Sequence, residues 1–210
     1  MITAASLTTI FGILALTCLL ALHFASPEFQ PSWRMISEYA MGGHKWLITA
    51  FFVFWGLSSF SLAAYLWPRV NGGWATAGVV LLVISGVGET MGGLFDLKHK
   101  LHGTAFILGV PAVPVAALLI GYHLTSETRH TLTIIASHST WISMVLMGVS
   151  LAILMTGFKN AGYKIDQNTP PPETLPDGVI ALAGYANRLL ILCYVGWLLL
   201  IANTNYSLKY

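Results

Sequence analysis

Charged residues are scarce in this sequence: only 9% of its 210 residues are Asp, Glu, Lys or Arg, whereas 56% are hydrophobic. Soluble globular domains carry roughly 25% charged residues, so this composition excludes a water-soluble fold. The formal net charge is only +2, and the basic residues stand singly rather than in the patch that nucleic-acid binding requires. We therefore predict an integral membrane protein and expect no nucleic-acid partner.

Cysteine is nearly absent as well, and the familiar catalytic motifs of soluble enzymes are missing. Cys18 and Cys193 both lie in apolar stretches, where we expect free, inert thiols that do not report on the redox compartment. The sequence contains no Gly-x-Ser-x-Gly elbow, no His-Glu-x-x-His helix and no phosphate-binding glycine loop. These absences leave the question of enzyme activity open.

Long apolar runs are what the sequence has instead, and six of them exceed the ~18 residues that cross a ~30 Å hydrocarbon core as a helix. The predicted spans are Ile2 to Phe24, Trp46 to Leu66, Gly73 to Phe95, Gly103 to Tyr122, Leu132 to Phe158 and Val179 to Ala202. We predict an all-α, polytopic bundle of about six transmembrane helices that forms one domain over residues 1–210. An even number of spans puts both termini on the same side of the membrane.

Two of the connecting loops are long. The loop of residues 25–45 interleaves Trp33, Ile36 and Tyr39 with polar residues, which predicts either an interfacial helix or a plain surface loop. The loop of residues 159–178 is rich in proline, and proline forbids a continuous helix and favours an extended linker.

Two prolines, Pro111 and Pro114, fall inside the fourth span. Proline removes a backbone donor and clashes with the preceding turn of a helix. We therefore expect a kink that frees backbone carbonyl groups inside the bundle.

Two ionisable residues lie deep in the predicted spans. Glu89 lies about two turns, roughly 10 Å, inside the third span, and Arg188 lies at a similar depth in the sixth span, counted from the same side. Ionisable groups at such depths usually face the bundle interior and pair with one another. We predict that Arg188 pairs with Glu89, or failing that with Asp96, either as part of a functional site or as a purely structural ion pair.

The segment between the third and fourth spans carries further candidate groups. Asp96, His99 and His102 are spaced three residues apart, and such residues can ligate zinc with one position left open for water. This zinc site is an alternative, because a loop histidine beside lysines is usually just solvated, and we expect no cofactor. Glu38, Asp96 and His102 are the candidate catalytic residues, since partial burial can tune an acid or base to act near neutral pH.

Three segments together resemble a known family: Ile36-Ser37-Glu38-Tyr39, Leu101-His102-Gly103 and Gly184-Tyr185-Ala186-Asn187-Arg188. They resemble the prokaryotic membrane family catalogued as domain of unknown function 998, in order along most of the chain. The resemblance implies a six-span bundle in the prokaryotic inner membrane and implies no established reaction. It maps the family's residues onto Ser37, Glu38, His102, Gly103 and Arg188.

A more distant likeness, in the Ser-Glu loop and the histidine that opens a span, is to the eukaryotic DRAM and GPI-anchor-remodelling membrane proteins. That resemblance suggests lipid handling. The function that we favour is therefore a lipid- or isoprenoid-binding protein, and in an enzymatic form a lipid-modifying one, with a polar cavity on one side of the membrane. Its candidate ligand-binding residues are Ser37, Glu89, Asn187 and Arg188, with the arginine suited to an anionic head group.

Two other functions remain as alternatives. In the first, the protein is a transporter or channel for a small solute or a proton, with Glu89 and Arg188 as a switchable pair. In the second, it is a non-enzymatic scaffold or accessory subunit, and the buried pair fixes the helix register. Besides membrane lipid, the expected partners are a second copy of the chain or another subunit of a membrane complex.

Overall fold

The spans predicted from hydropathy are confirmed to within a few residues. The computed structural model describes residues 2–126, 130–163 and 172–204, and the described part contains 6 helical segments that are long and apolar enough to cross a membrane. The fourth of these segments consists of two helices. The helices are α1 (Ala4–Ala25), α2 (Lys45–Leu66), α3 (Gly73–Leu94), α4 (His102–Gly109), α5 (Ala112–Ser126), α6 (Thr131–Asn160) and α7 (Ala183–Asn203).

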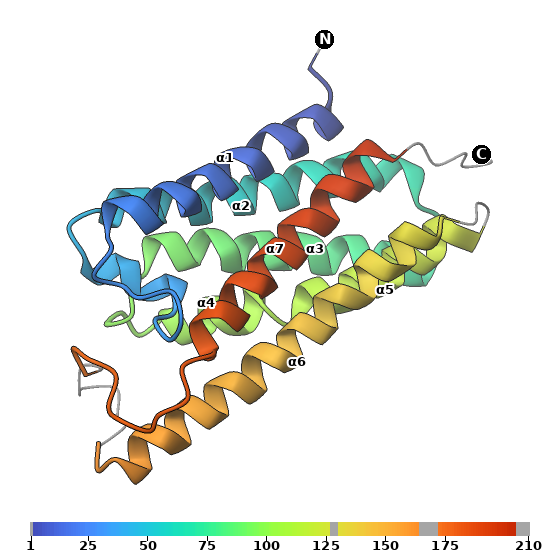
Figure 1. The fold of residues 1–210 in the computed structure, drawn as a ribbon. Coiled ribbons are helices and arrows are strands. Elements are labelled where there is room, and N and C mark those ends of the chain that lie inside the picture. The colour runs from blue at the N-terminus through green and yellow to red at the C-terminus, as the bar shows by residue number, and fades with distance from the viewer. Residues whose placement is uncertain (1, 127–129, 164–171, 205–210) are drawn as a thin grey trace.

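The helices form one bundle in which most chain neighbours also pack side by side (Figure 1). α1 packs on α2, α2 on α3, and α6 on α7, while α7 returns to contact α1. Asn203 at the end of α7 donates a hydrogen bond of 2.9 Å to Thr9 near the start of α1. The first and last spans therefore begin and end at the same end of the bundle, and the side of the membrane on which they lie stays a prediction.

The fourth span is broken where its prolines predicted a kink. α4 ends at Gly109 and α5 begins at Ala112. The two carbonyl groups at the break accept hydrogen bonds from other helices: Gly109 O from Ser85, at 2.8 Å, and Val110 O from the hydroxyl of Tyr194, at 3.0 Å. The predicted release of backbone carbonyls into the bundle is confirmed.

The first loop, residues 26–44, folds over one end of the bundle, and its position relative to the membrane surface stays a prediction. It contains a short 3₁₀ helix, η1 (Ile36–Met41), and the side chains of Trp33, Ile36 and Tyr39 are only 2%, 2% and 1% exposed. The aromatic and aliphatic residues that suggested an interfacial helix instead fill the end of the bundle between the spans. For the second long loop, the residues 164–171 that include two of its prolines lie outside the described residues.

Candidate functional site

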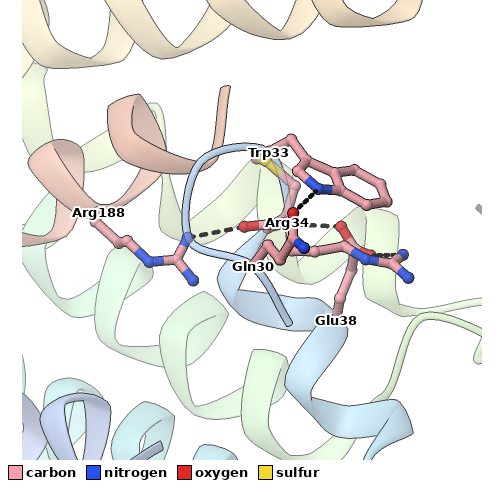
Figure 2. A network of polar contacts seen from close by, with 6 residues as sticks. Gln30, Trp33, Arg34, Glu38 and Arg188 are labelled. Carbon is pink, nitrogen blue, oxygen red and sulfur yellow. Dashed lines mark hydrogen bonds and ion pairs between the residues drawn. The ribbon is translucent and has the colours of Figure 1, made fainter. Parts of the chain in front are cut away.

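Arg188 of α7 ties the first loop to the bundle. Its Nε donates a hydrogen bond of 2.8 Å to Nε2 of His23, and its Nη1 donates to the backbone oxygens of Arg34 and Gly184, at 2.7 and 2.9 Å. Its Nη2 donates to the hydroxyl of Tyr39, at 3.2 Å. Figure 2 shows the guanidinium reaching from α7 to the carbonyl oxygen of Arg34.

The predicted ion pair between Arg188 and Glu89, or Asp96, is wrong. Among the described residues, the guanidinium has neutral acceptors as its hydrogen-bond partners, and neither ion pair of the described part includes Arg188. Arg188 and Glu89 lie at similar depths in their helices, as predicted, but the side chain of Arg188 points in a different direction around its helix. Successive residues of a helix are turned by about 100°, so Asn187 faces the cavity described below while Arg188 faces α1 and the first loop.

Gly184 and Asn187 hold the same loop from one turn of α7. The amide of Gly184 donates to Ser32 O at 3.0 Å, and a Cβ at position 184 would collide with the carbonyl oxygen of Pro31. Asn187 accepts, through Oδ1, a hydrogen bond of 2.9 Å from the amide of Ile36. Two of the segments that carry the family resemblance, around η1 and at the start of α7, are therefore in direct contact.

Glu38 belongs to an ion pair within the first loop. Its Oε2 accepts from Nη1 of Arg34 at 2.7 Å, and its Oε1 accepts from the amide of Met35 at 2.8 Å, which caps η1. The Arg34 guanidinium also lies 4.2 Å from the centre of the Trp33 ring (Figure 2). With both carboxylate oxygens used in this way, Glu38 stabilises the loop and does not line the cavity.

Asp96 lies outside the cavity as well. Its Oδ2 accepts a hydrogen bond of 2.7 Å from Nζ of Lys45, and this contact holds the pKa of the Asp96 carboxyl below its usual value. His99 accepts a hydrogen bond from the amide of Leu101. Within the described ranges, no group of three or more His, Cys, Asp or Glu side chains is placed to hold a metal ion, so the alternative set of Asp96, His99 and His102 does not converge.

We expect Asp96→Asn to have a small, pH-dependent effect. The side chains of Lys45 and Asp96 are 51% and 33% exposed, and such exposed pairs contribute about 1 kcal/mol or less. Because the folded-state pKa of Asp96 is lowered, its contribution is present above the unfolded pKa of ~3.9 and is lost as the pH falls through the folded value. Thermal unfolding of the wild type and the variant should differ slightly near neutral pH and converge in acid.

A cavity of about 100 Å³ opens at the end of the bundle where the first loop, α3, α4 and α7 meet. Its polar lining residues are Ser37, Glu89, His102 and Asn187. The rest of its lining is mostly apolar and includes Phe52, Trp55, Ala105, Phe106, Met147 and Leu190. Three of the four predicted ligand-binding residues and one of the three predicted catalytic residues thus line one cavity.

Glu89 lies at the buried side of this cavity, with 2% of its surface exposed. Ser59 of α2 donates a hydrogen bond of 2.6 Å to Oε2, and Ser85, one turn earlier on α3, lies 2.8 Å from Oε1. Hydroxyl partners therefore satisfy both oxygens of the carboxyl group without a cation.

The other polar groups of the cavity keep some of their hydrogen-bonding capacity. His102 Nδ1 lies 2.9 Å from the carbonyl oxygen of Phe95; because a carbonyl only accepts, this nitrogen carries the proton and Nε2 of the neutral ring keeps a lone pair. Asn187 uses its oxygen on Ile36, which leaves its amide protons as donors. Trp55 Nε1 is buried without a hydrogen-bond partner in the described part of the chain.

Sequence reasoning missed four residues of these networks. His23 and Tyr39 were assigned to a span end and to a loop, and their pairing with Arg188 depends on how the first loop folds back. Ser59 and Ser85 were overlooked as partners of Glu89. Ser85 could have been found, because it precedes Glu89 by four residues and so lies on the same helical face.

Comparison with known proteins identifies a family that the chain matches. A family model described as protein of unknown function DUF998 matches residues 9–204, nearly the whole chain. The comparisons with curated proteins and with solved structures gave no match.

Proposed function

The chain belongs to the DUF998 family of membrane proteins, and we propose that it binds the polar head of a membrane lipid in the cavity between the first loop, α3, α4 and α7. The observation that carries this proposal is the composition of the cavity, in which Ser37, Glu89, His102 and Asn187 lie within an apolar wall. Ligand sites commonly combine an apolar wall with a few polar groups that fix orientation.

The position of Phe106 favours a lipid over a water-soluble ligand. This residue of α4 lines the cavity and is also 48% exposed on the apolar outer surface of the bundle. A lipid tail can leave the cavity past this ring into the hydrocarbon region. The volume of about 100 Å³ is below the ~150 Å³ of a cavity that accommodates benzene, so it suits a small head group with the tail outside.

The alternatives lose part of their basis. The transporter hypothesis depended on a switchable pair between Glu89 and Arg188, and that pair is not formed. The scaffold hypothesis used the same pair to fix helix register, whereas Arg188 holds the first loop instead. Lipid modification would need its reacting groups in the cavity, and of Glu38, Asp96 and His102 only His102 lines it. Binding is therefore the activity that we propose, in the prokaryotic inner membrane.

Site-specific photo-crosslinking tests this proposal. We expect Phe106→p-benzoylphenylalanine, irradiated in native membranes, to crosslink one lipid class far above its share of the membrane. The reason is that the side chain at position 106 borders both the cavity and the bilayer. The measurement is mass spectrometry of the crosslinked protein.

The matched control is Ile13→p-benzoylphenylalanine on α1. Ile13 is 52% exposed and lies on the outer surface away from the cavity, so it should crosslink lipids in proportion to their abundance. Identical lipid profiles at positions 106 and 13 would mean that the cavity border contacts only annular lipid, and the proposal would be rejected.

A further inference from the structure

The hydrogen-bonding groups of the cavity define the charge of the head group that it accepts. The only titratable side chains among its lining residues are Glu89 and His102, so no lysine or arginine lines it. The nearest guanidinium along α7, that of Arg188, donates to His23, Tyr39 and two backbone oxygens instead. A phosphate or carboxylate head would therefore meet no permanent cation, and burial of an unpaired charge is strongly unfavourable.

The hydrogen bonds around Glu89 indicate that its carboxyl group carries a proton. The hydroxyl of Ser85 lies 2.8 Å from both Glu89 Oε1 and the carbonyl oxygen of Gly109. A hydroxyl has one proton to donate, and a carbonyl oxygen has none. Both contacts can be hydrogen bonds at the same time only in one arrangement. In it, the Ser85 hydroxyl donates to the carbonyl oxygen of Gly109, and a proton on Glu89 Oε1 is donated to the Ser85 oxygen. Ser59 donates to the other carboxyl oxygen, Oε2.

With a neutral carboxyl at its buried side, the cavity also offers no partner charge to an ammonium head. Its remaining groups are of both kinds: Nε2 of His102 accepts, and the side-chain amide of Asn187 donates. An ammonium only donates and a carboxylate only accepts, whereas a hydroxyl does both.

We propose that this cavity selects lipids with an uncharged hydroxyl head over the same lipids with an anionic or cationic head, an inference that rests on the proposed function. The hydroxyl donates to His102 Nε2 and accepts from the amide of Asn187. The hydrocarbon chain leaves past Phe106.

Three probes with the same chain test this selectivity: oleyl alcohol, oleylamine and oleate. Each is added at equal mole fraction to the purified protein in phosphatidylcholine nanodiscs, and the retained adduct is measured by native mass spectrometry after release into detergent. We expect the alcohol to be retained at least about tenfold more than either charged probe, because the charged heads lose hydration without gaining a counter-ion. Preferential retention of oleate or oleylamine would overturn the inference and leave lipid binding intact.

Two histidines three residues apart supply a matched pair of variants. His102→Ala should lower retention of the alcohol by roughly three- to tenfold, the effect of one lost hydrogen bond. His99→Ala should leave it unchanged, because His99 is exposed and lies outside the cavity. Equal effects of the two substitutions would count against a contact between the head group and His102.

Glu89→Gln tests the protonation state directly. A glutamine accepts from Ser59 through its oxygen and donates to Ser85 through its amide, which reproduces the pattern proposed for the protonated carboxyl. We expect the ratio of retained alcohol to retained oleylamine to be the same in the variant as in the wild type, because neither side chain offers a charge to the amine. A wild-type preference for oleylamine that disappears in the variant would show an ionised Glu89 and overturn the inference. Retention of none of the probes, together with matching crosslink profiles at positions 106 and 13, would overturn lipid binding itself.

Discussion

Replacing Arg188 with methionine is expected to lower the free energy of unfolding by several kcal/mol, because each buried acceptor left without its donor costs about 1–3 kcal/mol. The substitution leaves Arg34 O, the Tyr39 hydroxyl and Nε2 of His23 without their donor in the bundle. Denaturant-induced unfolding in mixed micelles measures the loss. Arg188→Lys should recover little of it, because a lysine has a single nitrogen and cannot reach acceptors at different edges of the guanidinium group.

The same variants should release the first loop. Arg34 is 9% exposed in the folded protein, so trypsin should cleave after this residue slowly in the wild type and rapidly in Arg188→Met. The control is Arg69→Met near the end of α2, where the guanidinium donates to Tyr65 O and lies 4.1 Å from the Tyr65 ring centre. That half-buried contact contributes about 1 kcal/mol, between the values for exposed and desolvated cation–π pairs. If Arg69→Met destabilised the protein as much as Arg188→Met, the hydrogen bonds of Arg188 to the first loop would contribute no more to stability than an ordinary arginine contact.

The spans and the proline break could be predicted because they depend on local properties of the chain. The length of an apolar run decides whether a helix can cross the membrane. The missing amide of Pro114 decides where the fourth span loses a hydrogen bond. Neither property requires knowledge of which helices are neighbours.

The partner of Arg188 could not be predicted in this way. Hydropathy gives the depth of Glu89 and Arg188, but the moment of an almost uniformly apolar helix does not define which face turns to which neighbour. Two of the four acceptors that Arg188 uses are backbone oxygens, and the positions of Arg34 O and the Tyr39 hydroxyl depend on the path of the first loop. Backbone acceptors carry no signature in the sequence.

The cavity could be predicted in part. Ser37, His102 and Asn187 came from segments shared with a family, and Glu89 came from the cost of a carboxyl group inside the membrane. What the sequence did not contain was the separation of two roles on α7, where Asn187 lines the cavity and its neighbour Arg188 supports the wall. Neighbouring residues can therefore have different roles, one lining the cavity and the next supporting its wall, because a helix turns by about 100° from one residue to the next.

Gly88→Ala is expected to destabilise the bundle and to close the cavity, because α3 and α4 are in backbone contact at this point. A Cβ on Gly88 would collide with the amide nitrogen of Gly109 and would lie 2.7 Å from the oxygen of Ala105. Backbone atoms cannot move aside as a flexible side chain does, so α4 has to shift as a whole. Forcing extra atoms into a packed interior costs about 1–3 kcal/mol, and the shift also breaks the hydrogen bond from Ser85 to Gly109.

Gly148→Ala on α6 provides a control of opposite sign. A Cβ there has no neighbouring heavy atom within 4 Å, so this substitution should stabilise α6 by roughly 0.5–1 kcal/mol through the lower entropy of alanine in the unfolded chain. The two variants are compared by denaturant-induced unfolding and by retention of oleyl alcohol. Gly88→Ala should lose both stability and retention, and Gly148→Ala should lose neither. Since α4 carries His102 and Phe106, a Gly88→Ala protein that kept wild-type retention would show that the lipid head does not depend on the contact between α3 and α4.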